Sequence, residues 1–287
     1  AIPVLTGLKT ESEKFAGADK TYCIEAMMGD KRALQAGTSH NLGQNFAKAF
    51  DVTFQTKENK KELVWATSWG VSTRLVGAVI LTHGDEKGLR LPPKIAPIQV
   101  VIIPISRNEE QEKAVKDYLA PIVESLEGAD VRVHQDWTDN SPGFKFNEWE
   151  MKGVPLRLEV GPRDVKNGNM VVARRDTGDK SFLSKDEAVA QIPDLLEEIQ
   201  KGLFQQALIF QQENTHKVST YDELKKVIKE GGFVRCGWDG TDETEARVKE
   251  DIKATIRCIP MSENPEGLTC VYSGKPAKHE VIYAKAY

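Results

Sequence analysis

Apolar positions in the middle third of the chain follow the two-residue repeat of β-strands. The strands predicted in this way cover residues 98–105, 131–133, 154–160 and 170–175. The first of them is apolar almost without interruption, which is typical of a strand buried on both faces. In the third, every second side chain is apolar, so Arg157 and Glu159 face away from the core.

Apolar positions three and four residues apart predict helices between and beyond these strands. Capping boxes mark two helix starts, at Ser184 and at Thr220. The helix after Ser184 is the longest and contains Pro193, a residue that kinks helices. Residues 72–82 are apolar almost throughout and fit either a helix or a strand. The other predicted helices cover residues 41–50 and 109–126. Strands that alternate with helices indicate an α/β arrangement, an open sheet with helices against it.

Length and composition are those of a globular protein with two or three domains. The chain has 287 residues, of which 40% are hydrophobic and 29% charged. Prolines at 92, 93 and 97 break regular structure and predict a linker near residue 96. The net charge of −4 argues against non-specific DNA binding. It leaves RNA open, because unpaired bases are bound by stacking and local positive patches.

The sequence carries no signal for a membrane or for secretion. No apolar run approaches the roughly 20 residues of a membrane span, and the first residues lack a charged segment and a cleavage site. Four sparse cysteines predict a reduced, cytosolic protein. The chain begins without Met and inside patterned sequence, so we expect it to be a piece of a longer protein.

Arg74 is the candidate anion-binding residue of the N-terminal third. It follows a turn of small residues and enters an apolar segment, where a charge is costly unless it is paired. A nucleotide phosphate accepts planar, bidentate bonds from a guanidinium group, and so does a carboxylate in a structural ion pair. The local residues alone leave both interpretations open.

Residues 68–77, followed by His83-Gly84-Asp85 and by residues 88–93, resemble motif 3 of prolyl-tRNA synthetases. The other matching segments are residues 10–18, 24–28, 35–46, 141–150, 153–157, 161–164 and 284–287. They occur in the family's order, and the resemblance covers essentially the whole chain. It is closest to the archaeal and eukaryote-like branch, which carries an additional C-terminal domain.

This resemblance implies three parts and one activity. Residues 1–96 correspond to the C-terminal part of a class II catalytic domain with an antiparallel sheet. Residues 97–204 correspond to an α/β anticodon-binding domain with a mixed sheet, and residues 205–287 to a small α+β C-terminal domain. The parent enzyme ligates L-proline to tRNA(Pro) through a prolyl-adenylate, with ATP and Mg²⁺, as a cytoplasmic homodimer. Motifs 1 and 2 would precede Ala1, so we expect the chain to be inactive by itself.

The family motifs also imply site residues. The expected ATP contacts are Gln35, Thr38, Ser72 and Arg74. The expected proline pocket consists of Phe15, His40 and a wall of Ser68, Trp69 and Gly70. An aromatic wall with a few polar groups suits a small apolar ring. The competing interpretations are core packing for the two aromatic residues and a hydrogen-bonded histidine at a helix start.

Residues 141–164 are expected to read the anticodon, because their aromatic side chains are interleaved with basic ones. Unpaired bases stack on aromatic rings, while Arg and Glu read their edges. By resemblance, the anticodon contacts are Phe146, Glu150, Arg157 and Arg163. We expect an aromatic loop at residues 144–149. Packing of a solvated loop is the alternative for Phe144 and Trp149.

The resemblance implies a four-cysteine zinc site in the C-terminal part, of which only two cysteines remain. Cys236 and Cys270 match, whereas Thr244 and Ser273 stand at the other two positions. A structural zinc site needs four nitrogen or sulfur ligands, so we expect no zinc. Cys258 belongs to a strand-like run and is expected to be a buried apolar side chain.

Two other functions fit parts of the sequence. A threonyl or glycyl synthetase would share motif 3 and the anticodon fold, but Ser-Trp-Gly at 68–70 and Lys-Phe-Asn-Glu-Trp at 145–149 speak against it. A non-catalytic tRNA-binding or regulatory protein would keep the same domains, and this chain alone leaves that possibility open.

Overall fold

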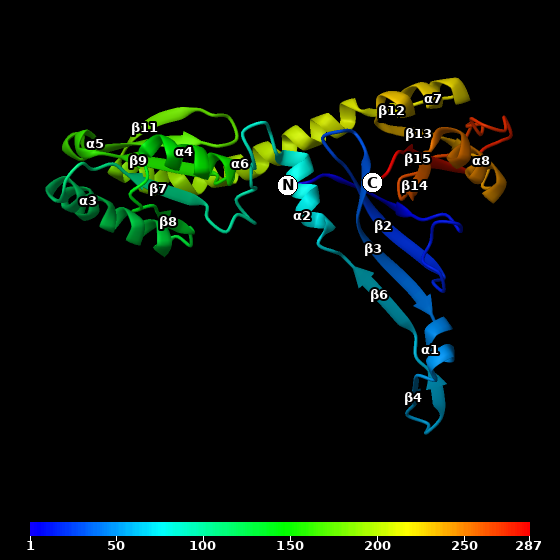
Figure 1. Ribbon diagram of the computed structural model, residues 1–287. Helices are drawn as coiled ribbons and strands as arrows, with labels where there is room; N and C mark the ends of the chain where they lie inside the picture. The colour runs from blue at the N-terminus through cyan, green and yellow to red at the C-terminus, as the bar shows by residue number, and fades with distance from the viewer. The chain divides into compact units, whose positions relative to one another are not determined.

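The computed structural model describes all 287 residues, which form two compact units. The first unit comprises Ala1 and residues 83–207, and the second comprises residues 2–82 and 208–287. Figure 1 labels most of the helices and strands of both.

A five-stranded mixed sheet lies at the centre of the first unit, in the order β11-β10-β9-β7-β8. β7 runs parallel to β8 and β9, whereas β9, β10 and β11 are antiparallel. The strands are β7 (Val100–Pro104), β8 (Val133–Gln135), β9 (Leu156–Val160), β10 (Asn169–Arg174) and β11 (Lys180–Ser184). The helices are α3 (Glu109–Gly128), α4 (Pro142–Met151), α5 (Pro162–Asn167) and α6 (Lys185–Glu213). This mixed sheet confirms the α/β class predicted for the middle of the chain.

The interior strand β7 is buried on both faces, as its apolar sequence predicts. Val100 and Ile102 pack against α3 and α6 in one core. Val101 and Ile103 pack against Trp149 of α4 in the other. The strand therefore separates two cores, one under α3 and α6 and one under α4.

The strand β9 alternates between these two sides as expected. Leu156 and Leu158 lie in the core under α3 and α6. On the other side Arg157 and Glu159 form an ion pair at 2.9 Å. Strand geometry thus sends the polar side chains of β9 to the side that α4 covers.

The aromatic loop expected at residues 144–149 is instead part of helix α4. The Ser141 hydroxyl caps this helix by accepting a hydrogen bond from the Phe144 N–H, at 3.4 Å. Pro142 occupies the first turn, where its missing N–H costs nothing. The helix buries Trp149, which is 8% exposed, and leaves Phe144 exposed.

An eight-stranded sheet runs through the second unit, in the order β12-β13-β15-β14-β1-β2-β3-β6. β12 and β13 are parallel, and all other neighbours are antiparallel. The strands are β1 (Val4–Leu8), β2 (Lys20–Met27), β3 (Ala33–Gly43), β6 (Ala66–Gly70), β12 (Thr215–Lys217), β13 (Phe233–Trp238), β14 (Thr255–Pro260) and β15 (His279–Ala284). The antiparallel strands β1, β2, β3 and β6 confirm the fold class predicted for the N-terminal part.

The remaining elements of the second unit are short. They are α1 (Asn45–Phe50), α2 (Arg74–His83), α7 (Tyr221–Glu230), α8 (Asp242–Ile252) and the hairpin of β4 (Thr53–Gln55) with β5 (Lys61–Leu63). Figure 1 shows α1 and β4 beyond the far end of β3. β3 continues to Gly43, so α1 begins later than residue 41, where the sequence predicts a helix. The ambiguous segment at 72–82 is helical. None of the helices has the length and apolar character needed to cross a membrane.

Strands from the two ends of the sequence meet where β1 pairs with β14. Gly7 lies opposite Pro260, and Leu8 lies opposite Ile259. The C-terminal part has two clusters of buried residues. Val234, Ile256 and Val271 lie under α7 and α8, with Ile259 partly buried against them. Phe233 and Ile282 lie beside Cys23 and Cys258. Parts 1–96 and 205–287 thus share one sheet, and the division into three domains stays a prediction.

Candidate functional site

Phe15, Thr21 and His40 form a connected group on the sheet of the second unit. The Phe15 N–H donates to Thr21 Oγ1 at 3.1 Å, and this oxygen lies 3.0 Å from His40 Nδ1. The rings of Phe15 and His40 have centroids 4.8 Å apart and planes tilted by 41°. His40 lies in β3 and not at a helix start. Phe15 is 48% exposed, so its ring is not buried in the core and is available to a ligand.

Strand register places three more expected residues, Gln35, Thr38 and Ser68, on the same face of the sheet as His40. His40 pairs with Thr21 on one side and with Ser68 on the other, and Thr38 pairs with Gly70. Side chains paired across antiparallel strands point to the same face. We call this side the His40 face. Gln35 lies on the His40 face as well. It pairs with Glu25, and Thr38 pairs with Cys23. Because Glu25 and Cys23 are two residues apart in β2, their side chains point to the same face.

Trp69 points to the opposite face, because it pairs with Ser39, the neighbour of His40. It is 81% exposed. With Tyr22, Ile24 and Val71 it lines a cavity of about 540 Å³. The expected wall of residues 68–70 is therefore divided between the two faces of the sheet.

Arg74 is the first residue of α2, and its side chain is exposed. Its backbone N–H donates to Ser72 Oγ at 3.3 Å, and its guanidinium forms no ion pair within the chain. Arg74 is therefore not the buried charge that the apolar sequence around it predicts. The side chain is instead free to meet an anion from solution.

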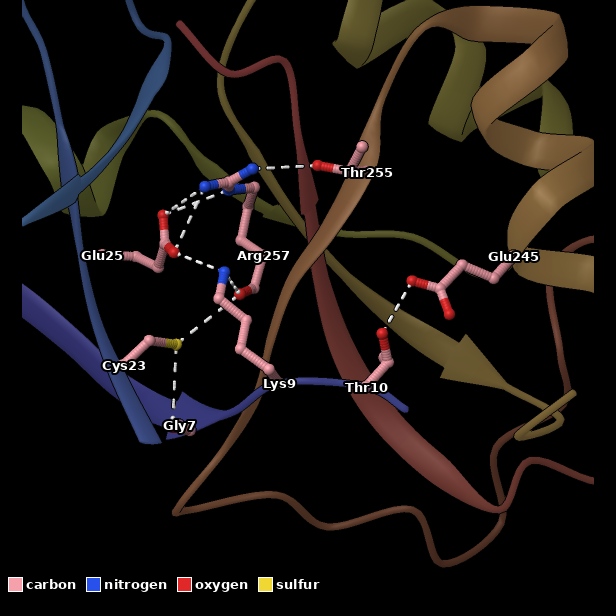
Figure 2. A network of polar contacts seen from close by, with 8 residues as sticks. All are labelled: Gly7, Lys9, Thr10, Cys23, Glu25, Glu245, Thr255 and Arg257. Carbon is pink, nitrogen blue, oxygen red and sulfur yellow. Dashed lines mark hydrogen bonds and ion pairs between the residues drawn. The ribbon is translucent and has the colours of Figure 1, made fainter. Parts of the chain in front are cut away.

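A buried ionic network surrounds Glu25 (Figure 2). Glu25 is the cross-strand partner of Gln35 and lies on the His40 face. The carboxylate of Glu25 is fully buried and accepts a hydrogen bond from Lys9 Nζ at 2.8 Å. It also accepts bonds from Arg257 Nε and Nη2, at 3.1 and 3.0 Å. Burial of these charges is tolerable because each has a close partner. The network connects β2 to β14.

In the first unit, an aromatic ring and charged side chains gather between α4 and β9. The Arg157 guanidinium lies 4.4 Å from the centroid of the Phe146 ring. Lys180 of β11 lies 5.6 Å from the same centroid and 2.9 Å from Glu159. Glu150 and Arg157 both line a cavity of about 160 Å³. Three of the four expected anticodon contacts are therefore grouped here.

The same cavity is lined by basic residues that the sequence reasoning did not single out. They are Lys87, Arg174, Arg175 and Lys180. The hairpin of β10 and β11 brings the last three beside β9. The adjacent arginines at the end of a predicted strand were the available signal. The position of Lys180 in this cavity could be predicted only from the pairing of β10 with β11, which the sequence does not reveal.

Arg163, the fourth expected anticodon contact, lies apart from this group. It is exposed on α5 and does not line the cavity. Its guanidinium makes no hydrogen bond or ion pair within the chain.

Two of the four positions expected around a zinc ion are occupied by hydroxyl side chains that share one carboxylate as their hydrogen-bond partner. Thr244 Oγ1 and Ser273 Oγ both donate to Asp239 Oδ2, at 2.9 and 2.6 Å. Cys236 and Cys270 are buried, and burial raises the pKa of Cys236 to about 12. No group of three or more His, Cys, Asp or Glu side chains in the chain is arranged to hold a metal ion. Cys258 is buried in β14, as expected.

Comparison with known proteins covers both units. Residues 99–195 match the anticodon-binding domain family, and residues 221–287 match the C-terminal domain of prolyl-tRNA synthetase. The proline–tRNA ligases of Chloroherpeton thalassium, Roseiflexus sp. and Flavobacterium johnsoniae are 56%, 52% and 53% identical to this chain over its whole length. The chain spans 61%, 60% and 59% of those relatives. It therefore belongs to the prolyl-tRNA synthetase family.

Proposed function

We propose that the protein takes part in the ATP-dependent ligation of L-proline to tRNA(Pro), with prolyl-adenylate as the intermediate. The whole ligase would combine this chain with the part that makes up the remaining length of the relatives. In that enzyme the second unit supplies one side of the amino-acid and ATP sites, and the first unit supplies the surface that reads the anticodon. The enzyme is a cytoplasmic homodimer in this proposal.

The group of Phe15, Thr21 and His40 carries the proposal for proline. Phe15 offers an exposed aromatic surface to the pyrrolidine ring. His40 and Thr21 place nitrogen and oxygen atoms next to that surface. Gln35 and Thr38 lie on the same face of the sheet and would adjoin the nucleotide.

The chemistry requires no protein nucleophile. The proline carboxylate attacks the α-phosphorus of ATP and releases pyrophosphate, and the prolyl group then passes to the 3′ end of the tRNA. Positioning and charge neutralisation provide most of the rate enhancement in such a reaction. Arg74 is exposed at the start of α2, where it can pair with the triphosphate. No group of three or more His, Cys, Asp or Glu side chains in this chain is arranged to hold Mg²⁺.

The anticodon proposal rests on the group around Phe146. A base can stack on an aromatic ring that already carries Arg157. Proline anticodons share guanines, and the Watson–Crick edge of guanine donates to a carboxylate such as Glu150. Its O6 and N7 atoms accept bonds from arginine. Glu150 and Arg157 line the same cavity, which suits one such base.

The anticodon proposal is tested on the chain itself with Glu150→Ala, which changes the group around Phe146, and with Arg163→Ala, which changes the expected contact that lies apart from that group. Each should weaken binding of a proline anticodon stem-loop by about 1–3 kcal/mol and reduce discrimination against a swapped anticodon. Glu148→Ala is the matched control, because Glu148 lies on the same helix and pairs only with Lys152. If both test variants keep full discrimination, the 141–164 block does not read the anticodon.

The catalytic proposal predicts that this chain alone does not support proline-dependent ATP–pyrophosphate exchange. A ligase completed to the length of the relatives should support it, and Arg74→Ala should lower its rate by at least about tenfold. Pyrophosphate exchange measured with proline, threonine and glycine separates the alternatives. Exchange with threonine or glycine instead of proline would favour another class II synthetase, and no exchange would favour a non-catalytic RNA-binding protein.

A further inference from the structure

Phe15 lies in the loop that joins β1 to β2, and the two halves of this loop are held by different parts of the chain. The later half is fixed to the sheet, because the Phe15 N–H donates to Thr21 Oγ1 and Ala18 is buried. Residues 10–14 make polar side-chain bonds only to one another and to helix α8. The earlier half therefore depends on an element of the C-terminal part.

Two contacts join this half of the loop to α8. Thr10 Oγ1 donates to Glu245 Oε1 at 2.9 Å (Figure 2), and these residues are only 2% and 4% exposed. Lys249 Nζ lies 2.9 Å from Glu13 Oε1. Glu245 and Lys249 are four residues apart, so they lie on one face of the helix. That face holds two loop residues that are three positions apart.

The Thr10–Glu245 hydrogen bond is shielded from water, so it is stronger than an exposed bond and restrains the loop more. The second oxygen of Glu245 has no hydrogen-bond partner although it is buried. A buried carboxylate with an unpartnered oxygen costs stability, since its lost hydration is only partly replaced. Core packing alone would be served better by an apolar side chain at this position.

We propose that α8 positions the Phe15 loop over His40 through Glu245 and Lys249. Both are positioning residues, because they touch the loop and not the ligand. The C-terminal part of the chain thereby sets the shape of the amino-acid side of the pocket. The identity of that ligand rests on the proposed function, whereas the restraint on the loop rests on the contacts alone.

The restraint is tested first in the 287-residue chain by amide hydrogen exchange with mass spectrometry. Thr10→Val removes the hydroxyl at nearly constant volume, and Lys249→Gln removes the exposed ion pair without touching the core. In the double variant, amides of residues 11–14 should exchange at least about fivefold faster, the factor given by a net hydrogen bond of about 1 kcal/mol. Amides of β13 and β15 should exchange as in the wild type, which shows that the unit is still folded.

Arg247→Gln is the matched control, because it removes a positive charge from the exposed side of α8 where no loop residue is bound. It should leave exchange in residues 11–14 unchanged. Unchanged exchange in the double variant as well would overturn the proposal, since the loop would then be held without α8. Equal acceleration across β13 and β15 would overturn it too, because the bonds would then be holding the whole unit together.

The consequence for the pocket is tested in the completed ligase with the same variants. KM for proline should rise by at least about fivefold, while KM for ATP and kcat change less than about twofold. Parallel changes in both KM values, or no change in either, would overturn the link between loop and pocket. If the wild-type ligase itself shows no proline-dependent exchange, the proposed function fails, and the hydrogen-exchange result still decides whether α8 holds the loop.

Discussion

Single residues of the first unit show how an ion pair becomes visible in the pH dependence of stability. Arg175 is buried, and its guanidinium donates two hydrogen bonds to the Asp85 carboxylate. Nη2 lies 2.6 Å from Oδ1, and Nη1 lies 2.8 Å from Oδ2. These bonds lower the pKa of Asp85 from 3.8 to about 2. Because the folded pKa lies below the unfolded one, the pair stabilises the folded state above pH 4. That contribution is lost as the pH falls toward 2.

Asp85→Asn should therefore lower the free energy of unfolding at pH 7 by about 1 kcal/mol, a value reduced for solvent screening of a partly exposed carboxylate. At pH 3 the difference from the wild type should be clearly smaller. Urea unfolding curves at the two pH values measure it. Asp139→Asn is the control, since Asp139 is exposed and has no ion pair. An equal loss at both pH values would show that the substitution acts through packing and not through charge.

At the scale of elements, the sequence predicts the strands better than the aromatic segment before them. β7 and β9 carry their burial pattern within a few consecutive residues, so their faces can be assigned without knowing their neighbours. In α4 the aromatic residues at 144, 146 and 149 do not follow a helical period. The usable signal there is the cap Ser141 followed by Pro142.

The candidate site depends on a feature that the sequence does not show. Whether Ser68 or Trp69 shares a face with His40 is decided by the register between β3 and β6. A one-residue shift would exchange the two side chains between the faces. The register is itself irregular between Asn41 and Gly43, where the pairing skips a residue. Family resemblance names the residues of this site, but only the pairing of the strands assigns their directions.

The start of α8 bears on the zinc prediction. Thr244 and Ser273 engage Asp239, and the Cys236 thiol stays protonated at neutral pH. Metal analysis of protein purified without chelator should find well under one zinc per chain. Thr244→Cys combined with Ser273→Cys is the positive control and should raise the zinc content toward one. A stoichiometric zinc in the wild type would contradict the prediction.

For the whole molecule, the decisive feature is the sheet that residues 2–82 share with residues 208–287. In a separate C-terminal segment, β14 would lose its partner β1 and Arg257 would lose the carboxylate of Glu25. Phe233 and Ile282, which are buried beside Cys23 and Met27, would also be exposed to water. Full burial of one such apolar side chain contributes about 1.5–3 kcal/mol, which is a large share of the stability of a small domain. We therefore expect the C-terminal part not to fold by itself.

Residues 208–287 expressed alone should therefore show no cooperative unfolding in urea and a poorly dispersed NMR spectrum. Residues 83–207 provide the matched control, because their cores are formed within the first unit, and they should unfold cooperatively. Addition of residues 2–82 to residues 208–287 should increase the dispersion of the spectrum. A stable, well-dispersed fold of the C-terminal segment alone would refute this account.

During synthesis β1 can pair with β14 only after the ribosome has made the intervening residues. Lys9 and Arg257 are 248 residues apart in the sequence. A ribosome that adds about 5–20 residues per second needs roughly 12–50 s to make the second after the first. Throughout that interval the backbone N–H and C=O groups on one edge of β1 are unpaired. They can then form hydrogen bonds with a strand of another protein, including β1 of a neighbouring nascent chain. The yield of soluble protein is thus governed partly by translation speed between the two, and slow codons in that stretch should favour aggregation.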